Sequence, residues 1–121
     1  MPVLAVALGA AGCGGGGDSN GSSQQDLKIA QANADVQEFC SVAGVGKGDV
    51  YDRAYYAMLD AVDTLSNAYK NNRDDKINLD QRNHCVPVDK VVRDSAARLA
   101  KNCGKDGKQQ SAKLQQALQQ Q

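Results

Sequence analysis

The stretch DVYDRAYYAMLDAVDTLSNAYKNN, residues 49–72, decides the fold of this chain. Its apolar side chains recur every three or four residues, which is the spacing of one face of an α-helix. Asp49 stands where the capping residue at the amino end of a helix is expected, and Asp52 follows three positions later. The sequence therefore predicts a long helix over 49–72, with one buried stripe formed by Tyr51, Tyr55, Met58, Val62, Leu65 and Tyr69.

Two more helices are predicted, one on each side of this stretch. The first begins near Asp26 and ends where glycines 44, 46 and 48 accumulate, and its stripe is Ile29, Ala32, Val36, Phe39, Cys40 and Ala43. The other begins at Pro87, which suits the first helical position because it has no N–H to leave unpaired. It ends before Gly104, and its stripe is Val88, Val91, Val92, Ser95, Ala96, Leu99 and Cys103.

The remaining segments have little apolar periodicity. Residues 72–86 are polar, and we expect a short helical turn over residues 79–83 within them. The tail 105–121 is rich in glutamine and has few apolar residues to bury, so it is expected to fray or to lie loosely against the bundle. The predicted fold class is all-α: a small three-helix bundle over 26–104, to which the tail adds a fourth helix if it is ordered.

The charge balance and the aromatic content bear on the class of partner. Lys and Arg together number 14, as do Asp and Glu, so the formal net charge is zero. The chain has no Trp and one Phe, so it lacks the stacking platforms of proteins that bind single-stranded nucleic acid. We therefore expect no nucleic-acid partner.

The N-terminal residues have the pattern of a targeting segment. The apolar run from Val3 to Ala11 is too short to cross a bilayer as a helix, which takes about 20 residues. Small residues Ala10, Ala11 and Gly12 precede Cys13, and a Gly/Ser-rich segment follows. In these features the chain resembles a bacterial lipoprotein precursor.

The resemblance implies a signal peptide over 1–12, cleavage before Cys13, and a lipid on the Cys13 sulfur with fatty acyl chains of the palmitate type. It implies a tether over 13–25. It also implies that Cys13 anchors the protein on the outer side of the cell membrane or at the outer membrane, because two or more acyl chains hold stably.

With Cys13 lipidated, three cysteines remain. Cys85 and Cys103 flank a predicted helix of about 16 residues and would lie roughly 24 Å apart, too far for a disulfide. In an up-down-up bundle the first and third helices are parallel, so Cys40 lies level with Cys103, and we predict this disulfide. Cys85 becomes the partner of Cys40 instead if residues 72–86 return along the bundle. Otherwise Cys85 is a free thiol that could join two copies into a dimer.

Catalytic, cofactor and metal sites are not expected. His84 is the only histidine, and its neighbours Cys85, Asp80 and Asp89 lack the spacing of a zinc site. The glycines of 44–48 do not match a phosphate-binding loop and are interpreted as a turn between helices. One histidine in the whole chain makes nucleophilic or general-base catalysis improbable, so the prediction is a protein that is not an enzyme.

Charged faces complete the prediction. The helix over 49–72 has an acidic side, formed by Asp52, Asp60 and Asp63. The helix after Pro87 has a basic side, formed by Lys90, Arg93, Arg98 and Lys101. We expect these two sides either to pair with each other within the molecule or simply to face solvent. Tyr56 falls off the buried stripe and is a candidate contact for a protein partner. The predicted function is a structural or protein-binding role in the cell envelope. The alternative is a carrier of a small ligand or metal, with a cavity between helices near Tyr55, Met58 and Cys85.

Overall fold

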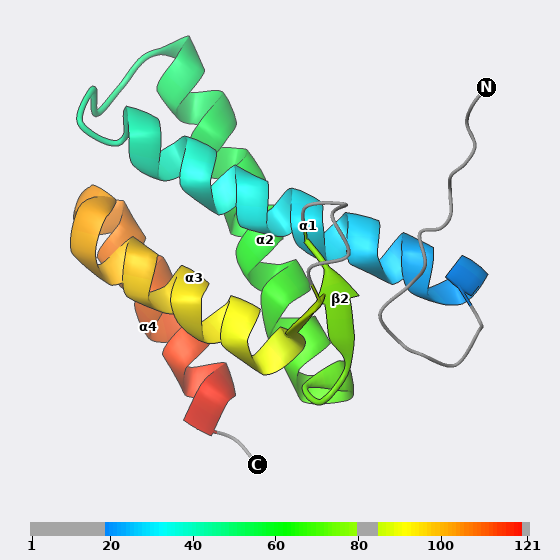
Figure 1. Cartoon of the computed structure of the whole chain (residues 1–121). Helices are drawn as coiled ribbons and strands as arrows, with labels where there is room; N and C mark the ends of the chain where they lie inside the picture. Colours follow the sequence, from blue (N-terminus) through cyan, green and yellow to red (C-terminus); the bar gives the residue numbers. More distant parts are fainter. Residues whose placement is uncertain (1–18, 80–84, 120–121) are drawn as a thin grey trace, which may run out of the picture.

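The structure is a computed structural model that describes residues 19–79 and 85–119 (Figure 1). It confirms a small all-α fold. The helices are α1 (Ser19–Val42), α2 (Asp49–Asn72), α3 (Val88–Asn102) and α4 (Gly104–Gln119), and a two-stranded antiparallel hairpin, β2 (Lys76–Asn78) and β3 (Cys85–Pro87), lies between α2 and α3.

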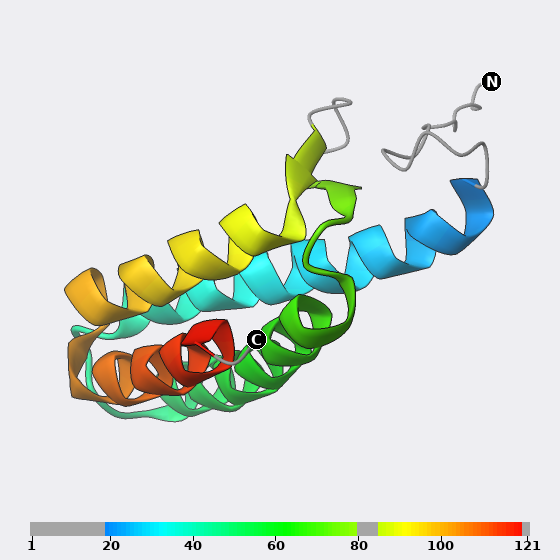
Figure 2. The same ribbon diagram turned by 90° about the horizontal axis from the view of Figure 1, so that it is seen from below.

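The four helices form two layers that pack face to face (Figures 1 and 2). α1 packs along α2 and α3 packs along α4, and these are the two most extensive interfaces in the fold. α1 and α3 run in the same direction, toward the end of the bundle that carries the turn between α1 and α2, and the parallel arrangement predicted for them is confirmed. The hairpin lies at the opposite end.

The core lies between these layers and takes side chains from every helix. Phe39, Met58, Leu65, Leu99 and Leu114 are all 0% exposed. The stripes predicted for α1, α2 and α3 supply most of the buried residues, which confirms the face that each helix was predicted to bury. Each large apolar side chain buried in this way contributes about 1.5–3 kcal/mol to stability.

A disulfide between Cys40 and Cys103 joins the C-terminal ends of α1 and α3, as predicted. The two Cα atoms are 4.4 Å apart. Directly after it, Gly104 has a φ of 72°, a left-handed conformation that reverses the chain from α3 into α4. Gly107 then packs against Cys103 and against the backbone oxygen of Leu99.

α1 begins earlier than predicted. Residues 19–25, assigned to the flexible tether, are helical and continue the first turns of the core helix. Asp26 is 7% exposed and packs against the hairpin, which fixes the helix at this point. Adding turns to a helix that has already formed costs less free energy than starting a new one, so the helix extends back to Ser19.

The C-terminal tail is also better packed than predicted. Residues 104–119 form α4, in which Leu114 is fully buried and Ala117 is 4% exposed. The Ser111 hydroxyl donates a hydrogen bond to the backbone oxygen of Ala96 at 2.7 Å. The expectation of a loose tail is wrong because its few apolar and small residues fall on one face, which allows close approach to α3.

The connection between α2 and α3 contains strands where a helical turn was predicted. Ile77 of β2 pairs with Val86 of β3 and is 1% exposed, so the hairpin buries this side chain against the bundle. Residues 80–84, which contain most of the predicted turn, lie outside the described residues, and Leu79 is not helical. Gly48 rather than Asp49 occupies the N-cap position of α2, and its oxygen accepts the Asp52 N–H at 2.8 Å.

A buried polar contact ties α1 to the hairpin. One carboxylate oxygen of Asp26 accepts the backbone N–H of Asn78 at 3.2 Å. The other oxygen of Asp26, the Asn78 side-chain oxygen and the Gln25 amide nitrogen are buried without a hydrogen-bond partner. Burial raises the pKa of Asp26 above its ordinary value, and the hydrogen bond from Asn78 opposes this shift.

Gly107→Ala tests the packing at the disulfide. In an open helical position this change stabilises by about 1 kcal/mol. Here the added Cβ would meet the Cys103 Cβ and would lie 2.8 Å from the Leu99 oxygen, so we expect a loss of about 1–3 kcal/mol in urea unfolding. Lys105→Ala, an exposed position in the same helix, is the control and should be nearly neutral. A stabilised Gly107→Ala protein would contradict this packing.

Asp26→Asn tests the buried carboxylate. The pKa of Asp26 is higher in the folded state than in the unfolded state, so the folded state binds the proton more tightly. The folded state therefore loses stability as the pH rises through the folded pKa and the carboxyl group becomes charged. The amide has no charge and can donate to the Asn78 side-chain oxygen. We expect a higher melting temperature than wild type at pH 7 and a shrinking difference toward pH 3.8. Asp63→Asn, at an exposed site, should show no such gain; a variant less stable at pH 7 would refute the assignment.

Candidate functional site

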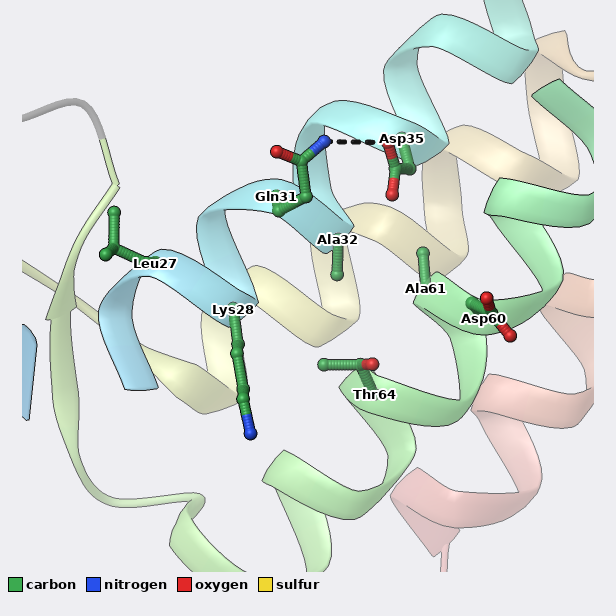
Figure 3. Close-up of a pocket in the computed structure, with 8 residues that line it drawn as sticks. All are labelled: Leu27, Lys28, Gln31, Ala32, Asp35, Asp60, Ala61 and Thr64. Atoms are coloured by element: carbon green, nitrogen blue, oxygen red, sulfur yellow. Dashed lines mark hydrogen bonds between the residues drawn. The ribbon is translucent and has the colours of Figure 1, made fainter. Parts of the chain in front are cut away.

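A groove with a volume of about 450 Å³ lies between α1 and α2 (Figure 3). α1 contributes one wall and α2 the other, and the residues that line it are Leu27, Lys28, Gln31, Ala32, Asp35, Asp60, Ala61 and Thr64. The groove lies on the outer face of the layer that α1 and α2 form, so a ligand could reach it without any movement of the core.

The floor of the groove consists of small side chains. Ala32 of α1 and Ala61 of α2 are 3% and 2% exposed, and their methyl groups leave a space that larger side chains would fill. Thr64 extends from α2 beside them. The floor is therefore apolar and narrow, which suits a slender aliphatic chain.

The two ends of the groove differ in charge. Asp35 and Asp60, one from each helix, flank Ala61 at one end, and Lys28 lies toward the other (Figure 3). The Gln31 amide donates a hydrogen bond to Asp35 Oδ1 at 2.9 Å and holds this carboxylate in place. Leu27 is 59% exposed beside Lys28. An apolar floor with an acidic end can accept a cationic side chain lying lengthwise.

The described residues contain no cluster of three or more histidine, cysteine, aspartate or glutamate side chains that could hold a metal ion. Of the residues considered as metal ligands, His84 and Asp80 lie outside the described part of the chain. Asp89 forms an ion pair with Arg93, with 2.7 Å between Asp89 Oδ1 and Arg93 Nε. The groove is lined by charged, amide, hydroxyl and small apolar side chains, which can bind a ligand through charge, hydrogen bonds and apolar contact.

The predicted cysteine sites have different outcomes. Cys13 and the signal peptide 1–12 lie outside the described residues. The pair Cys40 and Cys103 is confirmed, which removes the alternative of Cys40 with Cys85. Cys85 is exposed in β3, and the predicted dimer through Cys85 stays a prediction.

The residues considered for a small-ligand cavity lie in different parts of the described structure. Tyr55 lies near the turn between α1 and α2, where its ring centroid is 6.0 Å from that of Phe39. Met58 is 0% exposed within the core. Cys85 is exposed in β3, at the other end of the bundle. The structure therefore does not bring these three residues, Tyr55, Met58 and Cys85, to one site.

The acidic and basic faces do not pair with each other. Among residues 19–79 and 85–119 the ion pairs are Lys90 with Asp94, at 2.9 Å, and Arg93 with Asp89, both within α3. The carboxylates of Asp52, Asp60 and Asp63 on α2 are exposed to solvent. Of the two explanations given for these faces, intramolecular complementarity is wrong and solvation holds.

The tyrosines divide as the sequence predicted, with one addition. Tyr56 is 66% exposed, whereas the other tyrosines are buried or half-buried. The addition is a hydrogen bond of 2.5 Å from the Tyr51 hydroxyl to Asp106 Oδ2, which links α2 to α4. The hydrogen bond to this carboxylate is the main reason that the pKa of Tyr51 is raised to about 12. This contact was not predicted because Asp106 lies in the tail, for which no close packing was expected.

No family model matches the sequence, and no curated protein or solved structure resembles it closely enough to indicate a relationship. None of the described helices combines the length and apolar character needed to cross a membrane.

Proposed function

We propose that this protein is a lipid-anchored component of a bacterial cell envelope, displayed on the outer side of the membrane, whose helical domain works through protein contacts. The observation that carries the proposal is the run from Val3 to Gly12 followed by Cys13. An apolar segment of this length with small residues before a cysteine is typical of a signal peptide that ends in lipidation.

The short distance from Cys13 to the folded domain sets the orientation that this proposal implies. Five residues, 14–18, separate Cys13 from the start of α1 at Ser19. Fully extended, they reach roughly 18 Å. A lipid on Cys13 would therefore hold the N-terminal end of α1 near the membrane and direct the turn between α1 and α2 away from it (Figure 1).

The groove between α1 and α2 supports protein contacts over the transport of a small ligand. It is accessible along the side of the bundle, and its charged residues lie at its ends (Figure 3). A carrier site encloses most of its ligand, whereas a peptide or helix can lie along an exposed groove of this kind.

The anchor is tested by the mass of the mature protein from membranes of its native host. We expect an N-terminal Cys13 that carries a diacylglyceryl group, and a Cys13→Ser variant that keeps residues 1–12 and incorporates no labelled fatty acid. Because one sulfur cannot hold both a thioether and a disulfide, a peptide map that joins Cys13 to Cys85 would contradict the anchor. Recovery of the wild-type chain with Met1 intact would do the same.

A further inference from the structure

The two layers of the bundle carry opposite charge. α1 and α2 together contain seven acidic and three basic residues, whereas α3 and α4 contain seven basic and three acidic ones. The formal charge is therefore −4 on one layer and +4 on the other. The zero net charge of the chain conceals this asymmetry between its two faces.

Most of this charge is not neutralised within the molecule, because the ion pairs of the described residues both lie inside α3. On the layer of α1 and α2 the exposed acidic side chains outside these pairs are Glu38, Asp49, Asp52, Asp60 and Asp63. On the layer of α3 and α4 the exposed basic ones are Lys101, Lys105, Lys108 and Lys113.

The groove between α1 and α2 is shaped to accept a lysine side chain. A lysine has an apolar stem of four carbons and a charged head. The stem would lie over Ala32 and Ala61, and the ammonium group would reach Asp35 and Asp60 at the acidic end (Figure 3). Gln31 occupies only Oδ1 of Asp35, so the other oxygen can accept the ammonium group.

α4 presents lysines that can enter such a groove. Lys105 and Lys108 are exposed and three residues apart, so they lie on one face of the helix. Lys108 also borders a shallow hollow between α3 and α4, in which Ala100 and Ala112 are exposed in part. The basic layer therefore combines cationic side chains with small apolar ones, as the acidic layer does.

We propose that the outer face of α1 and α2 in one molecule binds the α4 face of a second copy, with Lys105 and Lys108 directed to Asp35 and Asp60. The two surfaces differ, so the interface is heterologous, and a dimer leaves one acidic and one basic surface open to further copies. The contact goes beyond the proposed function and does not require a lipid on Cys13.

Sedimentation velocity of the full, unlipidated chain tests the contact over a concentration series. At about 0.01 M salt the Debye length is about 30 Å, and at about 1 M it is about 3 Å. We expect a sedimentation coefficient that rises with concentration at low salt and stays at the monomer value at high salt. Non-reducing electrophoresis checks that the associated species is not linked by disulfides. A wild-type chain that stays monomeric at low salt overturns the proposal.

Charge reversal identifies the surfaces. The double variants Asp35→Lys/Asp60→Lys and Lys105→Glu/Lys108→Glu should each associate at least about tenfold more weakly than wild type, because like charges then face each other. An equimolar mixture of the two should associate again, since each supplies the surface that the other has lost. Circular dichroism confirms that both variants are folded.

Asp74→Lys/Asp75→Lys is the matched control. It changes the net charge as much as Asp35→Lys/Asp60→Lys does, but at exposed positions after α2. We expect it to associate as wild type does. Equal weakening by the control would show that net charge and not these surfaces governs association. A mixture of the two interface variants that stays monomeric would show that the two surfaces do not bind each other. Either result would overturn the proposal.

Discussion

The disulfide between Cys40 and Cys103 is the constraint on which the arrangement of the helices depends. It joins residues 63 positions apart, and in the chain-entropy account closing a loop of this length stabilises the fold by about 4 kcal/mol. That is a large share of the stability of a domain of this size. The bond fixes the C-terminal ends of α1 and α3 at one level, and the chain reverses directly after Cys103. Gly104 makes this reversal, and α4 is thereby placed against α3 and α2.

The sequence was sufficient to predict the elements whose side chains are sorted cleanly by polarity. On α2 and α3 the apolar residues recur without interruption, and their burial follows the predicted stripes. The pairing of Cys40 with Cys103 followed from topology alone, because parallel helices bring their C-terminal ends together. The hairpin could not be predicted, since three residues per strand are too few for a period of two to be recognised, and within the two strands themselves Ile77 is the only buried side chain. α4 was underestimated because its packing depends on small residues such as Ser111 and Gly107, which carry little hydropathy.

The groove between α1 and α2 could be foreseen only in part. Ala32 and Ala61 each lay within or beside a predicted stripe, but no pattern within one helix indicates that two alanines will face each other across an interface. The charge on the two layers was hidden for a related reason. A net charge of zero does not show how the charged residues are distributed over the surface. The charges of −4 and +4 can be assigned to two layers only once it is known that α1 packs against α2 and α3 against α4. Periodicity thus determines what each helix buries, whereas the surface properties depend on which helices become neighbours.

The proposed anchor and the proposed contact between copies are geometrically compatible. Residue 19, where α1 begins, lies at one end of the bundle, whereas the acidic and basic layers form its sides (Figures 1 and 2). Molecules held by Cys13 would all present the same end to the membrane, and their charged sides would face one another across the membrane plane. A heterologous contact between unlike sides can repeat without inverting any molecule, whereas a two-fold contact between like sides would bring charges of the same sign together. Tethering also confines the copies to a thin layer, so a contact too weak to persist at low concentration in solution would be favoured at the surface through a higher effective concentration.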